Sequence, residues 1–278
     1  MMCRLLSVCI LAVATIPSRV LAADPSTLTF TTIDVPGAVF TQARGINSAG
    51  QIVGTYQDSN FVFHGFLRSG NTFTTIDIPG ATFVDAIGIN NAGQIIGFYT
   101  TFSSTNAFLL DKGSVTTIEV PGANSTLALG INSRGQIVGS YTDGSGTHGY
   151  LLDNGTFTTI DVPGTNFTEA HGINSSGQIV GVYQGAGFTF HGFLLDGGTL
   201  TTIDVPGAAF TNPNGINMPG QIVGTYSGGH GFLVDGATLT TIDVPGANGT
   251  AVHGINAAGE IAGFYLDSAN AVHGFVAR

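Results

Sequence analysis

Residues 88–99 read GINNAGQIIGFY, and five other stretches of the chain repeat this pattern. The tripeptide Gly-Ile-Asn begins at positions 45, 88, 130, 172, 215 and 254, with spacings of 43, 42, 42, 43 and 39 residues. A second marker, Thr-Thr-Ile followed by Asp or Glu, has its Ile at positions 33, 76, 118, 160, 203 and 242 and shows the same spacings. Self-similarity at a fixed period of this kind is the signature of a repeat architecture.

Each repeat contains four short β-rich runs separated by turn residues. In the repeat that starts at Gly88, the runs lie around residues 88–90, 94–99, 107–110 and 115–120, and a Pro-Gly turn closes the unit. Four strands in a period near 42 residues are typical of a β-propeller blade. Neighbouring apolar residues within one run, such as Ile179 and Val180, indicate burial on both faces, as in blades that stack on one another.

The two ends of the chain carry complementary half-blades. A Thr-Thr-Ile-Asp strand at residues 28–35 precedes the first Gly-Ile-Asn, and the last repeat stops near Val276 without one. The N-terminal strand therefore completes the last blade and removes two free sheet edges. We expect an all-β fold, a six-bladed β-propeller of four-stranded blades. An open linear array is the alternative.

The composition excludes several classes of protein. Gly and Pro are abundant, at 42 and 10 residues, only 9% of residues are charged and 43% are hydrophobic, which argues against a helical bundle and against disorder. The net charge is −10, and the few Lys and Arg residues are scattered along the sequence. A nucleic-acid binder needs basic residues in a cluster, so we expect neither nucleic acid nor an anionic membrane as partner.

Residues 1–22 have the pattern of a secretory signal peptide. Arg4 supplies a positive start, residues 5–16 form an apolar run, and Val20-Leu21-Ala22 provides a cleavage signal of small residues. Both cysteines, Cys3 and Cys9, lie in this segment, so residues 23–278 form a propeller without disulfides. We expect a secreted monomer, extracellular or periplasmic.

The repeat resembles a known bacterial family. Gly-Ile-Asn-x-x-Gly-Gln-Ile-Val-Gly, followed by His-Gly-Phe-Leu and by an acidic residue before Pro-Gly, is similar to the extracellular repeats named after their His-Ala-Phe (HAF) tripeptide. The resemblance covers nearly all of residues 27–278. This chain has Gly where the family name has Ala, except at residues 106–108, which read Asn-Ala-Phe. The resemblance implies secretion and a β-repeat fold, and it supplies no activity.

Residues that recur in every repeat are expected to serve the blade. The Asn of each Gly-Ile-Asn precedes x-x-Gly, a spacing at which its side chain bonds the backbone two residues on. We assign the repeated acids to local backbone capping, the five repeated histidines to a bond with a neighbouring strand, and the repeated tyrosines to packing between blades. The alternatives are a cation held by the ring of acids and weak sugar sites, one at each tyrosine. The acids are Asp34, Asp77, Glu119, Asp161, Asp204 and Asp243; the histidines are His64, His148, His191, His230 and His273; the tyrosines are Tyr56, Tyr99, Tyr141, Tyr183, Tyr226 and Tyr265.

Function is expected where the repeats differ. The length variation is confined to the loop between the second and third runs, which shares one face of a propeller with the loop that leads into each Gly-Ile-Asn run, and loops on a rigid scaffold carry binding groups. Immediately before each Gly-Ile-Asn, near the mouth of the predicted channel, the residue also varies. The candidate ligand-binding residues are Gln42, Arg44, Asp85, Glu169, His171, Asn212, Asn214 and His253.

These features favour a secreted, noncatalytic binding or scaffold module that holds a protein or a carbohydrate at the loop face. We expect no catalytic residue, no metal and no cofactor. Two alternatives stay open. A calcium-dependent hydrolase or lactonase would need Asp85 and Glu169 to converge on the axis, and a multivalent lectin would use the tyrosine of each blade, since the chain contains no Trp.

Overall fold

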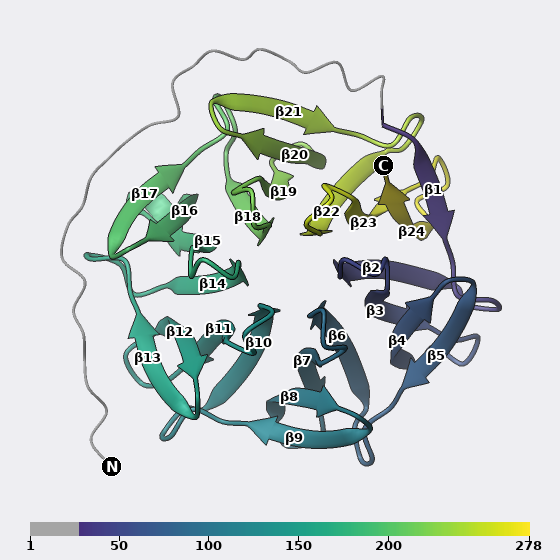
Figure 1. The fold of residues 1–278 in the computed structure, drawn as a ribbon, viewed down its shortest axis with the longest axis horizontal. Helices are drawn as coiled ribbons and strands as arrows, with labels where there is room; N and C mark the ends of the chain where they lie inside the picture. Colours follow the sequence, from purple (N-terminus) through teal and green to yellow (C-terminus); the bar gives the residue numbers. More distant parts are fainter. Residues whose placement is uncertain (1–27) are drawn as a thin grey trace.

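The computed structural model describes residues 28–278, and the predicted signal peptide lies outside them. Six antiparallel four-stranded sheets are arranged as blades around a central axis (Figure 1). One 3₁₀ turn, η2 (Ala186–Phe188), interrupts this β structure, and within the described range no helix has the length and apolar character to cross a membrane. The predicted six-bladed propeller is confirmed.

Every blade consists of strands a to d, from the axis outward. Blade 1 is β2 (Phe40–Ile46), β3 (Ile52–Gln57), β4 (Phe63–Ser69) and β5 (Thr72–Ile76); blade 2 is β6 (Phe83–Ile89), β7 (Ile95–Thr100), β8 (Thr105–Asp111) and β9 (Ser114–Ile118); blade 3 is β10 (Ser125–Ile131), β11 (Ile137–Thr142), β12 (Thr147–Asp153) and β13 (Thr156–Ile160). Blade 4 is β14 (Thr168–Ile173), β15 (Ile179–Gln184), β16 (Phe190–Asp196) and β17 (Thr199–Ile203); blade 5 is β18 (Thr211–Ile216), β19 (Ile222–Tyr226), β20 (His230–Asp235) and β21 (Thr238–Ile242); blade 6 is β22 (Gly249–Ile255), β23 (Ile261–Leu266), β24 (Val272–Ala277) and β1 (Phe30–Ile33).

The N-terminal strand closes the ring, as the half-blades predicted. Strand β1 pairs antiparallel with β24, from Phe30 opposite Ala277 to Ile33 opposite Gly274, and it forms the outer edge of the last blade (Figure 1). A side-chain contact adds to this pairing, because Nδ1 of His273 lies 2.9 Å from Oδ2 of Asp34. Both ends of the described chain are therefore held in one sheet.

The blades are held together by apolar contacts across their faces. Each blade places one fully buried aromatic ring on strand c, and the buried clusters combine residues of adjacent blades. Val53 of blade 1, for example, packs with Val84 and Phe108 of blade 2. Burial on both faces of the strands is the outcome that the adjacent apolar residues predicted.

The repeated asparagines form a continuous ring of hydrogen bonds around the axis. Oδ1 of Asn47 accepts from the backbone of Ala49 at 3.0 Å, which confirms the predicted turn. Nδ2 of Asn47 donates to the backbone oxygen of Asn90 in the next blade at 3.1 Å, and the same bond is repeated until Asn256 donates to Asn47. The six donors are Asn47, Asn90, Asn132, Asn174, Asn217 and Asn256, with distances of 3.0–3.1 Å. These bonds join neighbouring blades at the a–b turns.

Five of the six repeated acids bond histidines rather than local backbone amides. Nδ1 of His64 at the start of strand c lies 2.7 Å from Oδ1 of Asp77, which follows strand d of the same blade. Equivalent pairs occur in blades 3 to 6, and in all five the histidine ring stacks on the tyrosine that lies opposite it on strand b. The prediction for the histidines is confirmed. Backbone capping is wrong for these five acids, because each of them bonds an imidazole instead. The tyrosine hydroxyls bond threonines of their own blades, whereas the rings pack against buried clusters that combine residues of adjacent blades, so the predicted packing between blades is confirmed.

Candidate functional site

A β-bulge in every strand a places the variable residue in the central channel. In β2 the register with β3 shifts between Ala43 and Gly45, which leaves Arg44 without a pairing partner. The same shift recurs in all six blades, and a bulge re-aims the side chain of the extra residue. The bulged residues are Arg44, Ile87, Leu129, His171, Asn214 and His253, and all six border one cavity of about 330 Å³ on the axis.

The glycine after each bulge is required by close approach of the blades. A Cβ atom on Gly45 would lie 2.7 Å from the backbone oxygen of Ile87, and one on Gly254 would lie 2.6 Å from that of Arg44. The inner strands therefore meet backbone to backbone, and side chains at the bulges project into the narrow space that remains.

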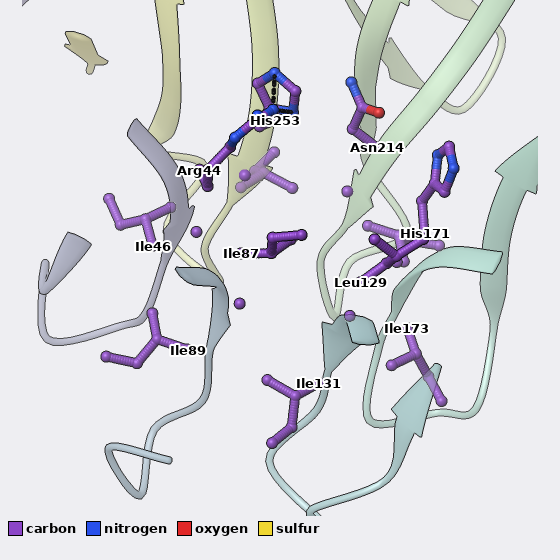
Figure 2. Close-up of a pocket in the computed structure, with 18 of the residues that line it drawn as sticks. Arg44, Ile46, Ile87, Ile89, Leu129, Ile131, His171, Ile173, Asn214 and His253 are labelled. Atoms are coloured by element: carbon purple, nitrogen blue, oxygen red, sulfur yellow. Dashed lines mark hydrogen bonds between the residues drawn. The ribbon is translucent and has the colours of Figure 1, made fainter. Parts of the chain in front are cut away.

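The cavity is polar at one end and apolar at the other. Figure 2 shows Arg44, His253, Asn214 and His171 at one end and isoleucines toward the other. The six isoleucines of Gly-Ile-Asn border both this cavity and a smaller one of about 100 Å³ beside the asparagine turns. Because Phe40 at the start of β2 lies opposite Gln57 at the end of β3, the d–a and b–c loops share a face, and the polar end of the cavity lies toward that face.

Arg44 is the centre of one polar cluster. Its Nη2 lies 3.2 Å from Oδ2 of Asp85, its Nη1 lies 3.2 Å from Nε2 of His253, and its guanidinium lies over the ring of Phe264. Asp85 also accepts a short hydrogen bond from the hydroxyl of Thr55. The Asp85 side chain is only 4% exposed, so its carboxylate serves to hold Arg44 and does not itself border the cavity.

His253 is kept neutral by its surroundings. Burial lowers its pKa well below the ordinary value of 6.5, and the positive charges of Arg44 and His171 lower it further. The ring also stacks on Phe264, with centroids 5.5 Å apart. A neutral ring keeps a lone pair for the Arg44 guanidinium, which has only donors to offer.

Glu169 and His171 form a second polar cluster on blade 4. Nε2 of His171 lies 3.4 Å from Oε2 of Glu169, Nδ1 lies 3.0 Å from the backbone oxygen of Pro213, and Ser140 donates to Oε1 of Glu169 at 3.0 Å. Burial raises the pKa of Glu169, but the hydrogen bond and charge of His171 and the hydroxyl of Ser140 bring it below its usual value. The carboxylate is therefore ionised at neutral pH.

The structure brings six of the eight predicted site residues to the axial cavity. They are Arg44, Glu169, His171, Asn212, Asn214 and His253. Gln42 and Asp85 do not border it: Gln42 lies beside strand b, opposite Thr55, and Asp85 is buried behind Arg44. Asn214 donates to the backbone oxygen of Val252 at 2.7 Å, whereas Oδ1 of Asn212 is buried without a hydrogen bond.

The described residues offer no metal-binding cluster and one arrangement that resembles a catalytic triad. Within residues 28–278, no three His, Cys, Asp or Glu side chains are placed to hold one metal ion. In blade 3 the hydroxyl of Ser145 lies 2.9 Å from Nε2 of His148, whose Nδ1 lies 2.9 Å from Asp161, which are the distances of a Ser-His-Asp triad. However, the hydroxyl and the backbone amide of Ser145 both bond Asp143, at 2.6 and 2.7 Å, so its amide is committed to a carboxylate rather than free for an oxyanion.

Exposed aromatic rings on the loop face are a feature that the sequence reading missed. Phe61, Phe102 and Phe188 lie in b–c loops and are 74%, 98% and 83% exposed. Phe61 and Phe188 have φ values of 65° and 62°, a conformation in which few bulky residues are found. The available signal was a Phe in the b–c loops of blades 1, 2 and 4, because such loops are otherwise built from small polar residues.

The fold and site together define a six-bladed β-propeller with an asymmetric axial cavity. The sequence matches no protein-family model and no curated protein. Among solved structures, the chain is similar to TolB from Acinetobacter baumannii (TM-score 0.57, 13% identity, 82% of this chain and 63% of that chain). It is also similar to the Aleuria aurantia lectin in complex with Fucα1-6GlcNAc (TM-score 0.55, 14% identity, 86% and 93%) and to a putative gluconolactonase (TM-score 0.55, 12% identity, 91% and 93%). At these identities the likeness shows a shared fold.

Proposed function

We propose that this chain is a secreted, noncatalytic binding propeller that holds one protein or carbohydrate group in the axial cavity at its loop face. One observation carries the proposal: the residue at the bulge, which the fold aims at the axis, differs from blade to blade. Arg44, His171, Asn214 and His253 replace an apolar residue there, whereas the glycines and isoleucines beside them repeat. A scaffold without a ligand has no need of a polar set confined to one end of its channel.

Several contacts disfavour the alternatives. The tyrosines that a multivalent lectin would use are engaged with a threonine of strand d, as in the bond between Tyr56 and Thr75 at 2.9 Å. Asp85, which a calcium-dependent hydrolase would need on the axis, bonds Arg44 and Thr55 instead. The resemblance to the HAF repeats and the signal-like residues 1–22 support the proposed secretion.

The proposal is tested with mono- and oligosaccharides and with calcium chloride, with and without chelator, in thermal-shift and calorimetric experiments. Binding to the native state raises the melting temperature. We expect one sugar site per chain, lost in Arg44→Ala and His171→Ala and retained in Ser133→Ala, which changes the opposite face. Several equivalent sites per chain would favour the lectin, and a calcium effect lost in Glu169→Gln would favour the hydrolase. Should no sugar bind, the same variants test a protein partner in a pull-down assay.

A further inference from the structure

A second cavity of about 240 Å³ lies between blades 4 and 5, and we call it the 4–5 slot. Its walls are the rings of Phe167, Phe190 and Phe210 with the side chain of Val182, and Glu169 and Asn212 provide its polar groups. Phe167 and Phe210 belong to the d–a connections of the two blades, and Phe190 begins β16, so the slot lies toward the loop face. It borders the axial cavity only through Glu169 and Asn212.

The equivalent place between blades 1 and 2 shows how such a slot is closed. There Phe63 packs against both Phe40 and Phe83, with ring centroids 5.6 and 5.3 Å apart. In the 4–5 slot the ring of Phe190 lies 5.4 Å from that of Phe167. The backbones of Phe190 and Phe210 form a parallel β-bridge, but the described rings include no ring contact between these two residues, and Phe210 is 41% exposed. The three equivalent rings therefore pack against one another between blades 1 and 2 and leave a cavity between blades 4 and 5.

The polar groups also differ between the two places. In blades 1 and 2, the hydroxyl of Thr55 and the guanidinium of Arg44 donate to Asp85. In blades 4 and 5 the position of Thr55 is Val182 and that of Asp85 is Asn212, so the amide has lost its hydroxyl donor. Oδ1 of Asn212 is buried and has no hydrogen bond, which costs about 1–3 kcal/mol unless a donor reaches it.

The charge of the slot favours a cation. Glu169 is ionised, because His171 and Ser140 hold its pKa below the usual value, and none of the six lining residues is basic. The faces of aromatic rings attract cations, and the whole chain carries 17 acidic against seven basic residues. Ring faces, a carboxylate and an unpaired amide oxygen together provide acceptors for a positively charged donor on an apolar body.

We propose that the 4–5 slot binds a protonated primary amine on a short apolar stem, the chemistry shared by a lysine side chain of a protein partner and a free alkylamine. The stem packs between Phe190 and Phe210. The ammonium group donates hydrogen bonds to Glu169 and to Oδ1 of Asn212. Arg44 donates to Asp85 in the same way between blades 1 and 2. This site shares Glu169 and Asn212 with the axial cavity, but it does not require a ligand there.

The test is saturation-transfer NMR and calorimetry on the full chain, with n-butylammonium as the probe and n-butanol as its neutral counterpart. We expect the ammonium to bind, more weakly at higher salt, and the alcohol to bind at least tenfold more weakly. Glu169→Gln and Phe190→Ala are each expected to weaken ammonium binding at least tenfold, whereas the matched Phe63→Ala in the closed slot leaves it within twofold. Equal binding of the two probes, or an equal loss in Phe63→Ala, would overturn the proposal.

Two further experiments identify the source of the amine and distinguish the 4–5 slot from the axial cavity. A lysine-containing peptide that binds more tightly than n-butylammonium, and loses binding on Nε-acetylation, identifies a protein side chain as the occupant; the reverse order identifies a free amine. Arg44→Ala is expected to leave amine binding in the 4–5 slot unchanged. Loss of ligand binding at the axial cavity can therefore be told apart from loss of amine binding in the slot. A neutral sugar that occupies the slot in place of the ammonium would contradict the inference.

Discussion

Replacing Asn132 by alanine tests whether the asparagine ring holds the blades together. Its Oδ1 accepts from the backbone amides of Arg134 and Gln136 at 3.0 and 3.1 Å, and its Nδ2 donates to the Gln136 side chain at 2.7 Å and to the Asn174 backbone oxygen at 3.0 Å. The side chain is buried at 4% exposure. At about 1 kcal/mol for each hydrogen bond, its loss costs roughly 4 kcal/mol of the free energy of unfolding. For a chain of this size that corresponds to a fall in melting temperature of roughly 8–16 °C.

Differential scanning calorimetry measures this change against two further variants. Ser133→Ala alters an exposed residue of the same turn and is expected to shift the melting temperature by no more than about 2 °C. Asn132→Asp keeps both acceptors but turns a carboxylate oxygen toward two carbonyl oxygens, so we expect a loss at least as large as that of Asn132→Ala. If Asn132→Ala melts within about 2 °C of the parent protein, the ring contributes little and the reasoning is refuted.

Three further outcomes follow from contacts and pKa shifts. Gly139→Ala puts a Cβ 1.9 Å from the Leu127 backbone oxygen and is expected to destabilise the fold by more than about 3 kcal/mol in urea unfolding, whereas Gly144→Ala, with open space around it, is expected to change little. The depressed pKa of His253 means that the unfolded chain binds a proton first, so stability falls as the pH drops below 6.5, and His253→Phe is expected to remove part of that slope. The pKa of His273 is raised, mainly by its hydrogen bond to Asp34, so this pair stabilises the fold below pH 6.5 and stabilises it less as the pH rises through the pKa of the folded state. Asp34→Asn is expected to lower the free energy of unfolding by up to about 1 kcal/mol at pH 5.5 and by less at pH 8.5.

The ring architecture was predictable because it rests on local rules repeated six times. The spacing of Gly-Ile-Asn, the Pro-Gly turns and the paired apolar residues each specify one blade, and the half-blades at residues 28–35 and 273–276 specify closure. The turn made by Asn47 was readable for the same reason, since it joins residues two apart. The bond from Asn47 to Asn90 was not, because it joins residues 43 apart whose approach depends on the ring.

The residues of the candidate site could be predicted from the sequence, but their orientation and their partners could not. The sequence showed that Arg44, His171, Asn214 and His253 vary at one position of the repeat, but not that a bulge aims them at the axis. Asp85 and Asn212 occupy the same repeat position, and only packing shows that the first is buried by Arg44 whereas the second has an unpaired oxygen beside a hollow slot.

The sequence alone therefore determined the number of blades, the strand order within each blade and the strand that closes the ring. Blade number and strand order follow from the hydrophobic period and the turn residues within each repeat of about 42 residues, and ring closure follows from the complementary half-blades at residues 28–35 and 273–276. The tertiary structure decided which polar groups meet across blades and which apolar spaces stay open. Those outcomes depend on side-chain contacts between different repeats, where a change from Thr55 to Val182 removes a hydrogen-bond donor and leaves the pattern of the strand unaltered.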